Sequence, residues 1–411
     1  MMSISKKKFI LIGYFVVALI LLLDCTNNFP GIFYLRKLKY VYIMILAVDF
    51  MTCRRKQITK ISAVVMFFLF FHTLLFGIVF VNPDVLELTR IHCREMVIYL
   101  LFLMLMTNAV ERYNCKLKFI EATCAAFAGF MLWCGITHIS NFVNPMYFIY
   151  VFNRTDRVRS EFGTGSPNYM GYYCFIALVF FYALWYEYNE TNRLTQKKKY
   201  GLLGISLWTI LILLSTGSRS SILSFFLFAT ICIYQLYFRE RLGKAKCLFV
   251  ILAVGVALIF VYMNWTSIWG NANREANISI NVPVFRQMNA FWKGMGYIES
   301  AGFYNDAYGY DTWPVDIYYL YIYLSTGIIG SLIIAIPLLY ILYRLIRKKD
   351  NFTRYVMLSV YIAILFDGLW QVNIFTYRYI ATLFIGVLLL ITISLQDKRG
   401  LGEIRRNEKT K

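Results

Sequence analysis

The sequence predicts an all-α, polytopic integral membrane protein, and three observations lead to this prediction. Of its 411 residues, 59% are hydrophobic and only 16% are charged, which is far from the composition of a soluble domain. Apolar runs long enough to cross about 30 Å of hydrocarbon recur along the whole chain. Basic residues collect between alternate runs, as membrane orientation requires. We expect about 12 transmembrane helices, with two extracytoplasmic loops that cap a cavity on the outer face.

The predicted spans follow these apolar runs in order. The first run comes after Lys6, Lys7 and Lys8 and lacks the small-residue cleavage site of a signal peptide, so we expect it to be retained as a helix. The runs cover residues 9–23, 38–52, 61–81, 93–110, 117–139, 168–187, 200–214, 219–237, 246–263, 315–342, 354–370 and 376–395.

The 42 lysines and arginines give the predicted orientation. Roughly two thirds of them fall in one alternate set of connections, which includes both chain ends, and positively charged short connections stay in the cytoplasm. Both termini should therefore be cytoplasmic. Because membrane orientation accounts for the net charge of +20, we predict no nucleic-acid partner.

This topology divides the chain into five parts, and two of them are long outer loops. Loops of this length are more often functional than idle, so chemistry is expected on the outer face. The nine cysteines form no CxxC pair, and we expect no structural disulfide, no metal and no cofactor. The parts are the N-terminal helices (1–139), the first outer loop (140–167), the middle helices (168–263), the large outer loop (264–314) and the last helices with a basic cytoplasmic tail (315–411).

The sixth predicted span begins with a Ser-Pro-Asn motif on the outer side. Ser166 is a candidate N-cap, Pro167 suits the first helical position, and Gly171 one turn later permits close backbone approach. A helix begun in this way directs free N–H groups outward, where Ser166 and Asn168 could contact a substrate. The alternative is a well-capped membrane helix with no ligand.

A Thr-Gly-Ser-Arg turn, Thr216 to Arg219, joins the next two predicted spans, again on the outer side. Arginine at a membrane boundary is costly unless it snorkels or finds an anion. The N-terminus of the following helix and the guanidinium, together with nearby hydroxyl groups, suit a phosphate or pyrophosphate. These hydroxyls belong to Thr216, Ser218, Ser220 and Ser221. Snorkelling alone remains the other interpretation of Arg219.

These motifs, in this order, resemble the O-antigen ligase and polymerase superfamily. The resemblance includes the Ser-Pro-Asn motif with Gly171, the Thr216–Arg219 turn, the long loop at 264–314 and a closing pattern from Gly327 to Gly330. It implies glycan transfer on the outer face of a bacterial cytoplasmic membrane, between substrates carried on undecaprenyl diphosphate. Arg219 would then stabilise the leaving pyrophosphate, and the sugar C1 would be open to attack by an acceptor hydroxyl.

The chain departs from the family pattern at Asp316. Ligases especially carry a His-Asn pair eleven residues before the first glycine of the closing pattern, and Asp316 stands at that position here. The resemblance therefore favours a repeat-unit polymerase of the Wzy type over a ligase. Asp316 could accept the proton of the acceptor hydroxyl or orient a sugar. It could also simply cap the following helix.

Further candidates lie on the outer loops, each with a structural alternative. Arginines of the first loop could hold phosphate or acidic sugars, or only attract anionic head groups. Arg378 and Asp367 could provide a second pyrophosphate contact and its partner, respectively, or an ordinary interfacial ion pair. Aromatic residues of the large loop could stack on sugar rings, although tyrosine and tryptophan also gather at membrane interfaces. The arginines are Arg154, Arg157 and Arg159, and the aromatic residues are Tyr297, Tyr304, Tyr308, Tyr310 and Trp313.

The resulting prediction is a membrane enzyme that polymerises undecaprenyl-diphosphate-linked oligosaccharide for an O-antigen, capsule or exopolysaccharide. Its expected partners are membrane lipids, a flippase and a chain-length regulator. Ligase-type transfer to another acceptor and a flippase or transporter are the alternatives. Transporters usually show internal repeats and broken helices, and the sequence indicates neither.

Overall fold

The computed structural model describes most of the chain, and the described part is almost entirely helical. A single antiparallel pair of two-residue strands, β1 (Tyr304–Asn305) and β2 (Tyr310–Asp311), is the exception there. The described residues are 2–26, 32–53, 60–81, 83, 86–142, 159–234, 272–297, 304–305, 310–311, 315, 317–348, 350–377 and 379–409.

Short connections join several neighbouring helices, such as α5 and α6 or α7 and α8. π-Helical turns extend α4 at Leu75–Val79 and precede α14 at Thr353–Met357, and a short 3-10 turn follows α6 at Ile139–Asn141. In chain order the helices are α1 (Met2–Asp24), α2 (Ile32–Leu35), α3 (Leu38–Thr52), α4 (Lys60–Leu74), α5 (Leu86–Arg112), α6 (Lys116–Thr137), α7 (Pro167–Glu190), α8 (Gln196–Thr216), α9 (Arg219–Ile233), α12 (Ala272–Gln287), α13 (Tyr318–Arg347), α14 (Leu358–Asp367) and α15 (Ile380–Lys409).

The helices coincide with all but one of the predicted spans, and the ninth span, 246–263, lies outside the described residues. Among the described helices, six are long and apolar enough to cross a membrane, while α9 and the apolar part of α15 are shorter. This all-helical architecture is consistent with a membrane protein. The count of twelve crossings stays a prediction.

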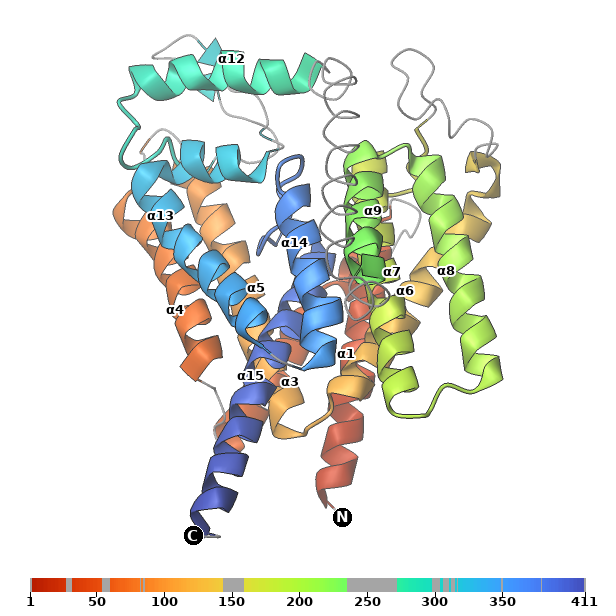
Figure 1. Ribbon diagram of the computed structural model, residues 1–411. Helices are drawn as coiled ribbons and strands as arrows, with labels where there is room; N and C mark the ends of the chain where they lie inside the picture. Colours follow the sequence, from red (N-terminus) through yellow and green to blue (C-terminus); the bar gives the residue numbers. More distant parts are fainter. Residues whose placement is uncertain are drawn as a thin grey trace, which may run out of the picture.

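Both chain ends lie at one end of the helical bundle, and α12 crosses over the opposite end (Figure 1). The end of α1 reaches the start of α7, because the Cys25 thiol lies 3.0 Å from the Tyr173 hydroxyl. The start of α15 lies there too, because Tyr379 packs edge to face on Tyr169 with ring centroids 4.9 Å apart. We call the end that α12 crosses the outer end of the bundle, and we call the end with the termini the inner end.

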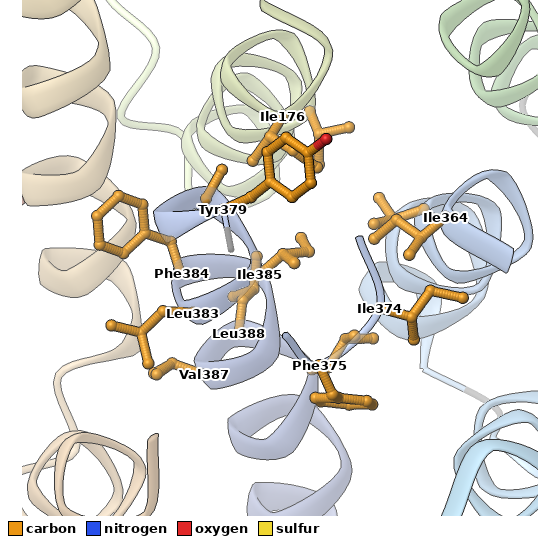
Figure 2. Close-up of a cluster of buried hydrophobic side chains, with 14 of the residues drawn as sticks. Ile176, Ile364, Ile374, Phe375, Tyr379, Leu383, Phe384, Ile385, Val387 and Leu388 are labelled. Carbon is orange, nitrogen blue, oxygen red and sulfur yellow. The ribbon is translucent and has the colours of Figure 1, made fainter. Parts of the chain in front are cut away.

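The first half of helix α15, Ile380–Ser394, occupies the centre of the bundle. Its apolar residues continue around the whole circumference, which is typical of a helix buried on all sides. Phe384 packs on Tyr14 of α1 and Phe127 of α6, with centroids 6.0 and 5.7 Å apart. Figure 2 shows Ile176 of α7 and Ile364 of α14 near other faces of the same helix. This packing holds helices from both halves of the chain in one core.

The span predicted at 315–342 is not one straight helix. Helix α13 begins at Tyr318 and breaks at Gly327, where φ is 64° and ψ is −165°. The first part of α13 runs across the outer end of the bundle, and the second part descends through it (Figure 1). The expectation of unbroken helices was therefore wrong at this position. Glycine permits the break because a side chain strongly disfavours such a backbone conformation.

Candidate functional site

The first turn of α7 packs directly against the turn between α8 and α9, so the two outer motifs form one site. A Cβ atom on Gly171 would lie 2.6 Å from Ser218 Cβ and 3.0 Å from Ser221 Oγ, closer than real side chains approach. The close approach predicted at Gly171 is confirmed. The predicted start of this helix is confirmed too, since Ser166 is the residue before α7 and Pro167 is its first residue. The Ser166 side chain, however, makes no capping hydrogen bond.

Internal hydrogen bonds shape the Thr216–Arg219 turn. Gly217 ends α8 in the left-handed conformation, at φ 59°. The Thr216 hydroxyl donates to the Leu213 carbonyl at 2.6 Å and accepts from the Ser218 backbone N–H at 3.2 Å. Thr216 is buried, and its hydroxyl holds the turn through both of these bonds. Its predicted substrate-binding role stays a prediction. Arg219 is half-buried and begins α9.

Buried serines continue from this turn into α9. Ser218 Oγ lies 3.1 Å from Ser221 Oγ and 3.4 Å from Ser220 Oγ. All three residues are buried, and Ser218 makes no side-chain cap on α9. The expected ring of hydroxyls therefore exists, but it faces the interior of the bundle. What remains toward the outer end is the helix N-terminus and Arg219.

The end of the first outer loop is fixed to both motifs. Arg159 donates from Nη2 to Asn168 Oδ1 at 2.5 Å, and the Ser160 backbone N–H donates to the Ser215 carbonyl at 3.2 Å. Partial desolvation lowers the pKa of Arg159, while nearby Glu161 acts in the opposite direction. A guanidinium nevertheless stays charged in proteins. Arg159 and Arg219 thus add positive charge to an end of the bundle where two helix N-termini already favour anions.

The chain after α14 packs against the serines of α9 on the inner side of the site. The residues predicted in this region, Asp367 and Arg378, did not include Gln371 and Asn373. Gln371 donates from Nε2 to Ser220 Oγ at 2.6 Å. Asp367 accepts from Ser224 Oγ at 2.9 Å and from the Asn373 amide. Asp367 is therefore held by neutral donors on two elements. Polar residues within an otherwise apolar stretch, Gln371 and Asn373, were the signal that could have indicated this cluster.

Residues 291–296, which we call the strap, fill the break in α13. In an unbroken helix the N–H groups of Ile328 and Ile329 would bond to the carbonyls of Leu324 and Ser325. The strap supplies a separate partner to each of these four groups, so the break leaves none of them unsatisfied. The bonds are Ile328 N to Phe291 O (3.0 Å), Ile329 N to Trp292 O (3.4 Å), Met295 N to Leu324 O (2.8 Å) and Gly296 N to Ser325 O (3.1 Å).

Two buried histidines hold the residue after the strap. The ring of Tyr297 stacks on His92 of α5, with centroids 3.7 Å apart and planes inclined by 14°. The Tyr297 hydroxyl lies 3.3 Å from His72 Nδ1 of α4, and the Tyr321 hydroxyl lies 3.3 Å from His92 Nδ1. Tyr297 is only 2% exposed. The prediction that it belongs to a sugar-stacking surface is therefore wrong, because it anchors the large outer loop to the bundle.

Several predicted site residues lie outside the described part of the chain. Asp316 and Trp313 lie beside described residues of the large loop and α13, and Arg378 lies between described residues before α15. The proposed pair of Asp367 and Arg378 therefore lies only partly within the described residues, because the structure describes Asp367 but not Arg378. The remaining residues in this group are Arg154 and Arg157 of the first outer loop and Tyr308 of the second.

Comparisons with known proteins add no relative. Neither protein-family models nor curated protein sequences match this chain. The function must therefore be inferred from the residues and their geometry.

Proposed function

We propose that this protein polymerises oligosaccharide repeat units carried on undecaprenyl diphosphate, by transferring the growing glycan to the next lipid-linked unit. The observation that carries the proposal is the contact of Gly171 with Ser218 and Ser221. It joins two motifs about fifty residues apart into one site, with Arg159 and Arg219 at the same end of the bundle. Such a site suits a diphosphate group, because helix N-termini and guanidinium groups both bind anions.

In this proposal the outer end of the bundle faces away from the cytoplasm of a bacterium. The distribution of lysine and arginine supports this orientation, since the basic α5–α6 and α7–α8 connections lie at the end that carries both termini (Figure 1). The glycan would reach the site on the outer face after a flippase has delivered it, and a chain-length regulator would act on the product.

The proposed chemistry is a direct displacement at the sugar C1. Arg219 would stabilise the charge that develops on the leaving diphosphate, and a well-placed donor of this kind is worth roughly 3 to 4 kcal/mol. Asp316 would accept the proton of the attacking acceptor hydroxyl. The new glycosidic bond forms as the C1–O bond to the diphosphate breaks, and no other reactant is needed.

A transporter or flippase is the second candidate, and the break in α13 at Gly327 favours it. Discontinuous helices that line a substrate path are common in transporters. Here, however, the strap occupies the break with backbone hydrogen bonds. A ligase shares the proposed chemistry and differs in its acceptor.

One comparison separates the three functions. Lipid-linked oligosaccharide is extracted from cells with and without the gene, and its length and membrane face are determined. Single repeat units that accumulate on the outer face support the polymerase. Accumulation on the inner face would instead indicate a flippase, and long unattached chains would indicate a ligase.

A further inference from the structure

Two buried amide side chains beside the serines of α9 each keep one polar end without a hydrogen-bond partner in the described part of the chain. Gln371 is 3% exposed and Asn373 is 1% exposed. Gln371 Nε2 bonds to Ser220, and the Asn373 amide nitrogen bonds to Asp367, yet Gln371 Oε1 and Asn373 Oδ1 have no partner. Leaving a buried polar atom unsatisfied is destabilising. Both atoms therefore need a donor that the described part of the chain does not supply.

The hydrogen bonds observed leave the oxygen of each amide open. Asn373 donates from its side-chain nitrogen to Asp367, and its oxygen has no partner in the described part of the chain. Ser224 and Asn373 occupy one oxygen each of the same carboxylate, which fixes the Asn373 side chain in place. Asp367 and Ser224 are thus positioning residues for an open acceptor at Asn373. Gln371, in the orientation observed, adds a second acceptor beside Ser220.

Hydroxyl groups are the donors that match two amide oxygens. Ser220 directly follows Arg219, so the Gln371 acceptor lies beside the first turn of α9. Asn373 lies about one turn further along α9, where its partner Asp367 bonds to Ser224. In a lipid-linked glycan the first sugar is bonded to that diphosphate, and its hydroxyls are the nearest donors. The two sides of the site are complementary, because the helix N-termini and arginines offer donors while Gln371 and Asn373 offer acceptors.

We propose that Gln371 and Asn373 bind hydroxyl groups of the sugar attached to the diphosphate, and so select a glycan-bearing lipid over the bare lipid diphosphate. The inference rests on the proposed function and names the part of the substrate that this end of the site recognises. Binding of the sugar supplies the donors that the two amides lack in the described chain.

The test uses the full-length protein purified in detergent and two probes. One probe is undecaprenyl diphosphate without sugar, and the other is the undecaprenyl-diphosphate-linked oligosaccharide extracted from cells that lack the gene. Gln371→Met keeps the length of the side chain and removes its acceptor. The matched control is Asn108→Leu, because Asn108 of α5 is also a buried amide with unsatisfied polar atoms, but lies toward the inner end.

Gln371→Met should bind the bare diphosphate as the wild type does and the oligosaccharide about three- to tenfold more weakly, as expected for the loss of one hydrogen bond. Asn108→Leu should bind both probes normally. Unchanged oligosaccharide binding by Gln371→Met would overturn the inference and leave a buried water as the partner of the amide. Equal weakening for both probes would also overturn it.

Failure of the proposed function has a different signature. Either the wild type binds neither probe, or cells without the gene do not accumulate single repeat units on the outer face. If Gln371→Met does not accumulate in the membrane, Gln371→Asn takes its place. That variant shortens the side chain by one methylene and keeps the polar amide. We therefore expect it to bind the oligosaccharide more weakly and the bare diphosphate normally.

Discussion

Gly294 of the strap and Gly327 of α13 meet backbone to backbone. A Cβ atom on Gly327 would lie 2.7 Å from the Gly294 nitrogen, and one on Gly294 would lie 2.3 Å from the Ser325 carbonyl. Both glycines have positive φ, 76° and 64°. The Gly-x-x-Gly closing pattern thus has a structural role at its first glycine, which lets the large outer loop insert into a broken helix.

Gly327→Ala should destabilise the protein by at least about 2 kcal/mol, because a left-handed alanine is strained and its methyl group meets the strap backbone. The thermal midpoint in detergent measures the loss. Gly201→Ala in α8 is the matched control, since nothing lies within 4 Å of its Cβ position, and alanine there should be neutral or slightly stabilising. Equal midpoints for the two variants would contradict the role of the break.

His92→Leu should release the strap. The substitution removes the ring that stacks on Tyr297 and the partner 3.3 Å from the Tyr321 hydroxyl, at a cost of about 1 kcal/mol for the lost hydrogen bond. A cysteine introduced at the fully buried Met295 should then react faster with a maleimide reagent. His138→Leu, at the end of α6, should leave the labelling rate unchanged. If the reporter stays protected in His92→Leu, the histidines do not hold the strap.

Gly171→Ala should separate the two outer motifs. The added methyl group overlaps Ser218, and overpacking of this kind costs about 1 to 3 kcal/mol. Polymer length and yield in membranes should fall even where the protein still accumulates, because α7 moves away from the α8–α9 turn. Gly204→Ala has open space around its Cβ position and should leave the polymer unchanged. Normal polymer from Gly171→Ala would show that the contact is unimportant for function.

Arg219→Ala should abolish chain growth while the protein remains in the membrane. Loss of one well-placed donor to the leaving group costs about 3 to 4 kcal/mol, or two to three orders of magnitude in rate. Arg219→Lys should recover little, because an ammonium group lacks the planar fork. The exposed Arg193, between α7 and α8 at the inner end, provides the comparison, and Arg193→Ala should make normal polymer. Full-length polymer from Arg219→Ala would contradict the proposal that Arg219 stabilises the leaving diphosphate.

The variant Asp316→Asn distinguishes between two roles of Asp316, that of a proton acceptor and that of a helix cap. Asparagine caps helices as well as aspartate does, but it cannot accept the proton of an acceptor hydroxyl. The variant should therefore lose polymer synthesis at unchanged stability. Asp350 is a genuine capping residue, with its carboxylate 2.9 Å from the Thr353 backbone nitrogen, so Asp350→Asn should be harmless. A normal polymer yield from Asp316→Asn would assign residue 316 to capping.

Helix positions were predictable because a membrane span depends on a local property, the length of an apolar run. The run at 38–52 coincides with α3, and the start predicted at Pro167 is the start of α7. The break at Gly327 was missed, because its cause is a strap more than thirty residues earlier in the chain. A hydropathy pattern indicates which residues avoid water. It does not indicate which backbone N–H and C=O groups form hydrogen bonds with a distant segment.

The candidate site was predictable only in part, for the same reason. Arg219 and Gly171 stand in short motifs that the sequence shows directly. Gln371, in contrast, meets Ser220 across 151 positions, and His72 meets Tyr297 across 225. No local sequence pattern predicts contacts between residues that are so far apart in the chain. The inward direction of the serine hydroxyls was also invisible, because a turn sequence does not say which side of the bundle it faces.

The sequence alone determined that this chain is helical and apolar, where its helices begin, and which end carries the basic connections, since each of these follows from composition and short-range spacing. The tertiary structure decided that two outer motifs share one site and that a loop satisfies the backbone groups at the break in α13. It also decided that two buried amides near the serines of α9 keep open acceptors. The physical reason is that hydrogen bonds and close packing between distant segments depend on how the helices meet.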